Sequence, residues 1–141
     1  MTRTRSAGGS NSLVTVLFVG YLLVVAWIVF WPSAEIAESS VAFLEAALRR
    51  LGAPAWVSTG VVEFGTNVLL FVPLSFLGTW LRPRWGVLRW SMVGLLASVG
   101  IELAQLLLLN DRSAEAIDLL ANTLGATCGA VLARWLRPRL R

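Results

Sequence analysis

The sequence predicts an all-α membrane protein with four transmembrane helices and an amphipathic interfacial helix between spans 1 and 2. Of its 141 residues, 57% are hydrophobic and only 14% are charged, which is too little charge for a soluble domain of this length. Four apolar segments each approach or exceed the roughly 20 residues that a helix needs to cross the hydrocarbon layer. Helices are expected because each one satisfies its own backbone hydrogen bonds in lipid.

The first predicted span covers residues 13–31, which contain no charged side chain. Residues 1–12 before it are expected to be disordered and cytoplasmic. Arg3 and Arg5 precede the apolar run and PSAEIA follows it, an arrangement that a secretory signal peptide also shows. We favour a retained span because the run is longer than the roughly 7–15 residues of a signal-peptide core.

Residues 34–52 are predicted to form the amphipathic helix. The segment is too short and too charged to span a membrane, so we expect it to lie in the interface, on the membrane or over the bundle. The simplest interpretation is a surface connection, and a lid over a binding site is the alternative. Its apolar positions recur at steps of four and three residues and so share one face; they are Ala37, Val41, Leu44, Leu48 and Leu51.

The remaining spans are predicted at residues 57–81, 87–109 and 116–136, followed by a basic cytoplasmic tail at residues 137–141. Each span carries polar or small residues on one face, because positions three or four apart stack on one side of a helix. Small residues also favour close helix packing in membranes. The polar faces comprise Glu63 and Asn67, then Ser91, Gly94, Ser98, Glu102 and Gln105, and finally Asp118, Asn122, Gly125 and Gly129.

Arginine placement predicts the orientation, because cytoplasmic connections carry an excess of basic residues. Both termini are therefore expected in the cytoplasm. The cytoplasmic side would hold Arg3, Arg5, Arg82, Arg84, Arg89, Arg134, Arg137, Arg139 and Arg141, and the outer side Arg49, Arg50 and Arg112. Tryptophans lie near the span ends, as an aromatic belt requires; they are Trp31, Trp56, Trp80, Trp85, Trp90 and Trp135.

In this orientation the polar residues of three spans lie at a common depth, about 9–10 Å below the outer ends at 1.5 Å per residue. An ionised carboxylate in hydrocarbon costs at least about 2.5 kcal/mol, so we expect these side chains to face one another in an outward polar pocket. Three carboxylates beside one arginine imply that one is protonated or that a cation binds there. The predicted ligand-binding residues are Glu63, Asn67, Glu102, Gln105, Arg112, Asp118 and Asn122.

Composition excludes several functions. The chain has no histidine and one cysteine, which removes histidine-based catalytic triads, imidazole zinc sites and intrachain disulfides. The pI is near 11, but the arginines lie at span ends and form no amphipathic basic face, so we predict no nucleic-acid partner. No metal and no cofactor are predicted, and no catalytic residue is assigned. A purely structural role of the polar layer, through interhelical hydrogen bonds, explains the amides better than the carboxylates.

Three motifs resemble the signature of VanZ-like membrane proteins over about residues 60–136. They are TNVLLFVPLSFL, then IELAQ, then an arginine followed by AIDLLANTLGA. Ser75 stands where the family usually has glycine, and Glu115 and Ile117 replace two aspartates. The matching residues are Asn67, Phe71, Pro73, Glu102, Gln105, Arg112, Asp118, Asn122, Thr123 and Gly125.

The resemblance implies a core at residues 57–136 and a multi-pass protein of the bacterial cytoplasmic membrane. It also implies a role in the cell envelope or in antibiotic resistance, because the family takes its name from a member associated with low-level teicoplanin resistance. The first hypothesis is a non-enzymatic protein whose pocket binds a membrane lipid, a lipid-linked cell-wall precursor or a lipoglycopeptide. The protein could act as a monomer or as a homo-oligomer. The second is an intramembrane enzyme acting on a lipid-linked substrate, with Glu102 and Asp118 as acid and base. The third is a proton-coupled carrier.

Overall fold

The computed structural model describes residues 7–31, 34–108 and 116–137. Within these ranges the chain forms five α-helices and no strand: α1 (Ala7–Val29), α2 (Ala34–Arg50), α3 (Thr59–Leu81), α4 (Val87–Leu108) and α5 (Ala116–Leu136). Helices α1, α3, α4 and α5 are long and apolar enough to cross a membrane. The all-α class, the four spans and the amphipathic helix between the first two are confirmed.

Several helix ends differ from the sequence-based prediction: α1 ends at Val29 and not at residue 31, and α3 begins at Thr59 and not at residue 57. Helix α1 begins at Ala7, so residues 7–12, which were expected to be disordered, are helical. Helix formation is cooperative, and the long apolar run propagates the helix into the polar residues before it. Helix α2 ends at Arg50, and Gly52 follows with a φ of +91°, the left-handed conformation that ends a helix and favours glycine. The predicted end of the third span, at residue 109, lies outside the described residues.

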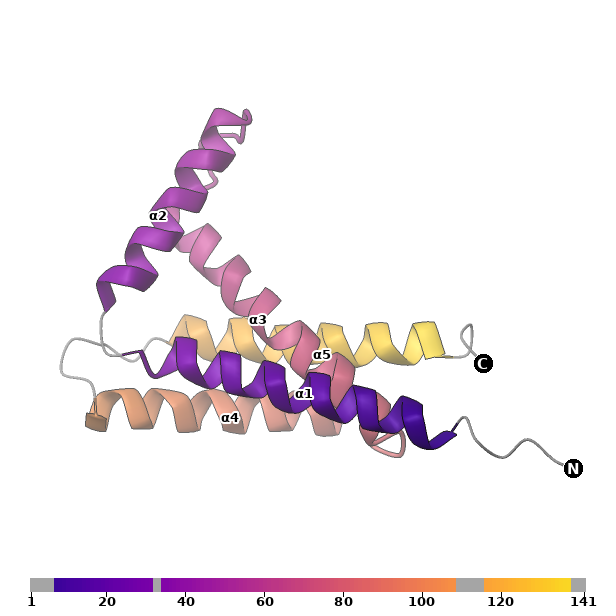
Figure 1. Ribbon diagram of the computed structural model, residues 1–141. Helices are drawn as coiled ribbons and strands as arrows, with labels where there is room; N and C mark the ends of the chain where they lie inside the picture. Colours follow the sequence, from indigo (N-terminus) through magenta and orange to yellow (C-terminus); the bar gives the residue numbers. More distant parts are fainter. Residues whose placement is uncertain (1–6, 32–33, 109–115, 138–141) are drawn as a thin grey trace, which may run out of the picture.

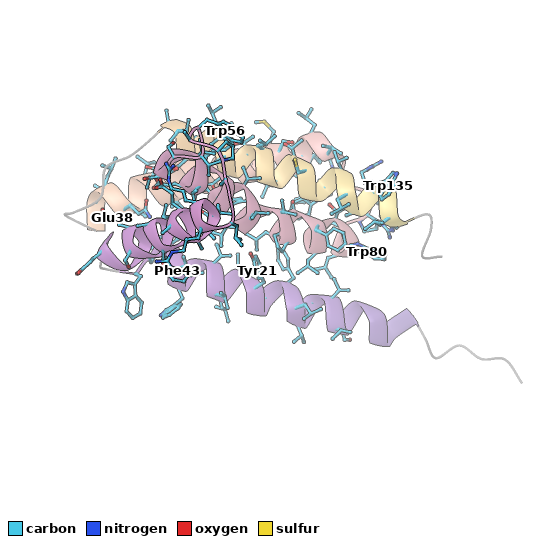
Figure 2. All side chains as sticks on the ribbon, turned by 90° about the horizontal axis from the view of Figure 1, so that it is seen from above. Tyr21, Glu38, Phe43, Trp56, Trp80 and Trp135 are labelled. Carbon is cyan, nitrogen blue, oxygen red and sulfur yellow. The ribbon has the colours of Figure 1, made fainter. Side chains whose placement is uncertain are left out.

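Helices α1, α4 and α5 run along a common direction, while α3 crosses them obliquely and α2 leaves the bundle at an angle (Figure 1). The most extensive packing is between α3 and α5, followed by that between α4 and α5. The start of α1, the α3–α4 connection and the end of α5 lie at one end of the bundle (Figure 1). Trp80 and Trp135 also lie at that end, away from α2 (Figure 2).

Helix α5 is held by close backbone contact with α3. A Cβ atom on Gly125 would collide with the carbonyl oxygen of Val68, and one on Gly129 would collide with that of Val72. Small residues let helices approach in lipid, where van der Waals packing replaces the hydrophobic effect as a source of association. The two glycines therefore pack against a helix of the same chain.

The other helices join this pair through smaller contacts. On α4, Gly94 faces Ala126 of α5, and the Oγ of Ser91 lies 2.7 Å from the Oγ1 of Thr127 within hydrogen-bond distance. On α1, Tyr21 points toward α3 (Figure 2) and its hydroxyl donates to the Leu70 carbonyl at 3.2 Å. Helix α1 is otherwise mostly exposed, as suits a helix that faces lipid.

The packing of α3 on α5 predicts a position-specific effect of adding one methyl group. Gly125→Ala should lower the free energy of unfolding by about 1–3 kcal/mol, because the added Cβ overpacks a backbone contact. Thermal unfolding of the detergent-solubilised protein, followed by circular dichroism, measures this. Gly100→Ala is the matched control, since a Cβ there would meet no described atom within 4 Å apart from its chain neighbours and the nearby backbone of its own helix. Equal destabilisation by both substitutions would contradict the role of Gly125.

Candidate functional site

A cavity of about 500 Å³ is lined by residues of all five helices. The lining residues come from the C-terminal end of α1 and Trp31 just after it, the C-terminal part of α4, the first 13 residues of α3, the N-terminal third of α5 and the middle of α2. Arg112, the seventh predicted site residue, lies outside the described residues. The structure brings the other six together in this cavity: Glu63, Asn67, Glu102, Gln105, Asp118 and Asn122.

Asp118 of α5 is positioned by an amide from α3. The Nδ2 atom of Asn67 donates to the Oδ1 atom of Asp118 at 2.7 Å, and the pair is partly buried. Asn67 precedes Val68, whose carbonyl lies against Gly125. The backbone contact that joins α3 to α5 therefore also places the amide within reach of the carboxylate.

Asn122 is positioned in the same way from α4. Its Nδ2 atom donates to the Oγ atom of Ser98 at 2.9 Å, in fully buried surroundings. The Oδ1 atom of the same amide is buried and accepts no hydrogen bond from any described residue. Glu102, one helical turn beyond Ser98 on α4, is 6% exposed. The polar face that was predicted for this span thus faces α5 and the cavity.

Gln105 joins α4 to the end of α1. Its Nε2 atom donates to the carbonyl of Val29 at 3.0 Å, and Val29 is the last residue of α1. The last carbonyls of a helix have no partner within the helix, so a side-chain donor satisfies one of them here. This bond brings the C-terminal end of α1 to the cavity.

Helix α2 supplies part of the cavity wall. Val41 and Leu44, two members of the predicted apolar face, line the cavity together with Ser40. Glu45 attaches α2 to the first residue of α3, because one carboxylate oxygen accepts from Thr59 at 2.5 Å and the other accepts from Arg49 at 2.9 Å. The hydrogen bond from Thr59, and then the one from Arg49, hold the pKa of Glu45 below its ordinary value of 4.5.

The cavity also contains residues that sequence analysis did not assign to a site. Trp27 of α1 and Trp31, two residues beyond its end, line it, and their rings meet edge to face with centroids 4.8 Å apart. The first span carries no polar residue near them, so the sequence offered no reason to turn this face toward the other spans.

The lining combines carboxylates and amides with hydrocarbon and aromatic walls. Among the described residues, no group of three or more histidine, cysteine, aspartate or glutamate side chains is placed to hold a metal ion. The apolar part of the wall includes Ile28, Leu70, Phe71 and Ile101. Such an arrangement suits a ligand that has both a polar group and a hydrocarbon part.

Comparison with known proteins agrees with the family resemblance of the three sequence motifs. A family model described as VanZ/LLP1 matches residues 18–137, which is nearly the whole chain. The match includes every described residue that lines the cavity. No curated protein and no solved structure matches the chain.

The lowered pKa of Glu45 predicts that α2 loosens from α3 at acidic pH. A carboxyl group whose pKa is lowered in the folded state stabilises the contact above its ordinary pKa, and this stabilisation is lost as pH falls through the lowered value. Spin labels at Ala46→Cys and Leu69→Cys, in a Cys128→Ser background, should report a narrow distance distribution at pH 7. We expect it to broaden below pH 4.5.

In the same labelled background, Glu45→Gln should broaden the distribution at pH 7 and remove most of its response to pH. Glu38→Gln, which changes an exposed carboxylate of the same helix, should keep the response of the unsubstituted protein. A distribution that is independent of pH in all three proteins would contradict the role of Glu45.

The hydrogen bond between Asn67 and Asp118 predicts a coupling free energy of about 1 kcal/mol between the two positions. The single substitutions Asn67→Ala and Asp118→Ala and the double variant form a cycle, measured by unfolding in mixed micelles with increasing dodecyl sulfate. A cycle of Leu69→Ala with Asp118→Ala is the control, because Leu69 is exposed on α3. It should give no coupling, and a coupling as large as that of Asn67 would argue against a specific bond.

Proposed function

The chain belongs to the VanZ/LLP1 family, and from this premise we propose that it binds an amphiphile in the cavity as part of the bacterial cell envelope. The ligand is a membrane lipid, a lipid-linked cell-wall precursor or a lipoglycopeptide, and binding contributes to tolerance of glycopeptide antibiotics such as teicoplanin. One observation carries the proposal. Six polar side chains from three spans meet in one cavity whose remaining wall is largely apolar.

A purely structural role does not account for the carboxylates. Amide hydrogen bonds such as that of Asn122 stabilise a helix bundle, but charged groups under a membrane surface are an inefficient means of gaining stability. Ionisable residues within spans usually mark binding sites or pathways. Glu63, Glu102 and Asp118 all line the cavity, which favours recognition of a ligand over support of the bundle.

The distribution of arginine supports an outward orientation of the cavity. The described arginines of the α3–α4 connection and of the α5 C-terminal end lie at the end of the bundle where α1 begins (Figure 1). Arg134 donates to the Trp85 carbonyl at 3.3 Å and so links these two elements. By the positive-inside rule this end is cytoplasmic. The cavity, at the opposite end of α1, then opens toward the outer leaflet of the cytoplasmic membrane.

The proposal predicts a specific loss in Glu102→Gln, which removes a buried carboxylate and keeps the size of the side chain. In native mass spectra of the detergent-extracted protein, the fraction with a co-purified amphiphile should fall about tenfold. A tenfold loss of affinity is what the removal of one hydrogen bond to a charged group is expected to cause. Expression in a teicoplanin-susceptible bacterium should raise the inhibitory concentration for the original protein and leave it at the empty-vector value for the variant.

Glu38→Gln is the matched control, because it removes an exposed carboxylate that is not among the described residues lining the cavity. This variant should keep both the bound amphiphile and the tolerance. If Glu102→Gln is present in the membrane in normal amount and keeps both as well, the proposed function is wrong.

A further inference from the structure

We infer that the cavity recognises a primary ammonium group on a ligand that also has a hydrocarbon part. This inference rests on the proposed binding function and names the chemistry of the polar group. Three features of the cavity lead to it: the sign of its formal charge, one buried acceptor atom and a pair of indole rings.

The lining favours a cation over an anion. It includes the carboxyl groups of Glu63, Glu102 and Asp118, and none of the described lining residues is basic. Arg112 follows α4 in the sequence and carries one positive charge, so including it still leaves more carboxyl groups than guanidinium groups. Complementary charge selects partners, and like charges repel them. A headgroup whose only charged group is a phosphate or a carboxylate therefore matches this lining poorly, whereas a headgroup that carries an ammonium group matches it.

One atom calls for a hydrogen-bond donor. Asn122 is only 6% exposed and lines the cavity, and its Nδ2 is held by Ser98, which sets the orientation of the amide. The Oδ1 of Asn122 accepts no hydrogen bond within the described part of the chain. A buried acceptor without a donor is unfavourable, so a ligand that donates to this oxygen gains from binding. A primary ammonium group has three donors, whereas a trimethylammonium group has none.

The indole rings and the apolar wall account for the rest of the ligand. A cation within about 6 Å of a tryptophan ring is attracted to its face, and Trp27 and Trp31 both line the cavity. Leu70, Phe71 and Ile101 offer hydrocarbon to an acyl chain. The carboxyl groups, the buried acceptor atom and the apolar wall of the cavity together match an amphiphile that carries an amine.

The test offers the purified protein three phospholipids with identical acyl chains in mixed micelles, and native mass spectrometry measures how much of each is retained. Phosphatidylethanolamine has a primary ammonium group, phosphatidylcholine has a trimethylammonium group, and phosphatidylglycerol has no cation. The original protein should retain phosphatidylethanolamine about tenfold over the other two, because a charged hydrogen bond distinguishes them. Equal retention of phosphatidylethanolamine and phosphatidylcholine would overturn the inference.

Two variants locate the selectivity. Asn122→Leu should bring the ratio of phosphatidylethanolamine to phosphatidylcholine close to one, because the acceptor is gone. Glu102→Gln should lower retention of the two zwitterionic lipids, phosphatidylethanolamine and phosphatidylcholine, relative to phosphatidylglycerol. It gives a second answer if Asn122→Leu unfolds in thermal melts. Glu38→Gln should keep the original pattern. Selectivity that survives both substitutions in the cavity would overturn the inference.

A further variant separates this inference from the proposed function. Ile101→Trp fills the cavity and should abolish retention of all three lipids. If it does so, and the original protein retains the three lipids equally, the ammonium inference fails and the binding function stands. If Ile101→Trp retains as much lipid as the original protein, the lipids lie outside the cavity and both fail.

Free ethanolamine, as chloride, tests whether the amine suffices without a hydrocarbon part. At the concentration of the phospholipid it should displace none, because it lacks the acyl chains that contact the apolar wall. Displacement at that concentration would show that the cavity binds soluble amines, and would overturn the assignment to an amphiphile.

Discussion

The close backbone approach of α3 and α5 determines how the rest of the bundle is arranged. At Gly125 and Gly129 there is no room for a side chain between α5 and the carbonyls of α3. This spacing brings Asn67 within hydrogen-bond distance of Asp118, since Asn67 directly precedes Val68 and Asp118 lies about two turns before Gly125. Helix α4 then packs on the same helix α5, where Gly94 meets Ala126 and Ser98 meets Asn122. Tight packing of small residues on one part of a helix thus sets the positions of polar residues further along it.

This arrangement explains how so many polar groups are accommodated under a membrane surface. Polar side chains in lipid are costly unless they face one another or water, and here amides from α3 and α4 bond to partners on other helices. Trp27 of α1, Trp31 just after that helix and the apolar face of α2 supply further parts of the wall. The result is a chamber that is polar on one part of its wall and apolar on the other, which is the basis for assigning it to an amphiphile.

The amphipathic helix α2 has two different attachments. Val41 and Leu44 contact the cavity through their apolar side chains, whereas Glu45 binds Thr59 through a hydrogen bond that depends on ionisation. The apolar contact of Val41 and Leu44 has no preferred direction, whereas the hydrogen bond of Glu45 requires a defined geometry. A helix held in this way remains part of the cavity wall while its contact with α3 responds to pH, and this differs from a surface connection that touches nothing but the membrane.

The sequence by itself determined the four spans, the interfacial helix and six residues of the cavity, because hydropathy and the helical repeat are local properties that require no knowledge of neighbours. Glu63, Glu102 and Asp118 could be assigned to one site because a charge in lipid must face something polar. Tertiary structure alone decided which helix receives Gly125 and Gly129, that α2 lines the cavity, and that Trp27, Trp31 and the carbonyl of Val29 belong to it. Beyond its first turns, helix α1 is apolar on nearly every side, so its pattern contains little information about which face meets the bundle. The face of α1 that meets the bundle is set by the shapes of the neighbouring helices and by the hydrogen-bond donors and acceptors that they present.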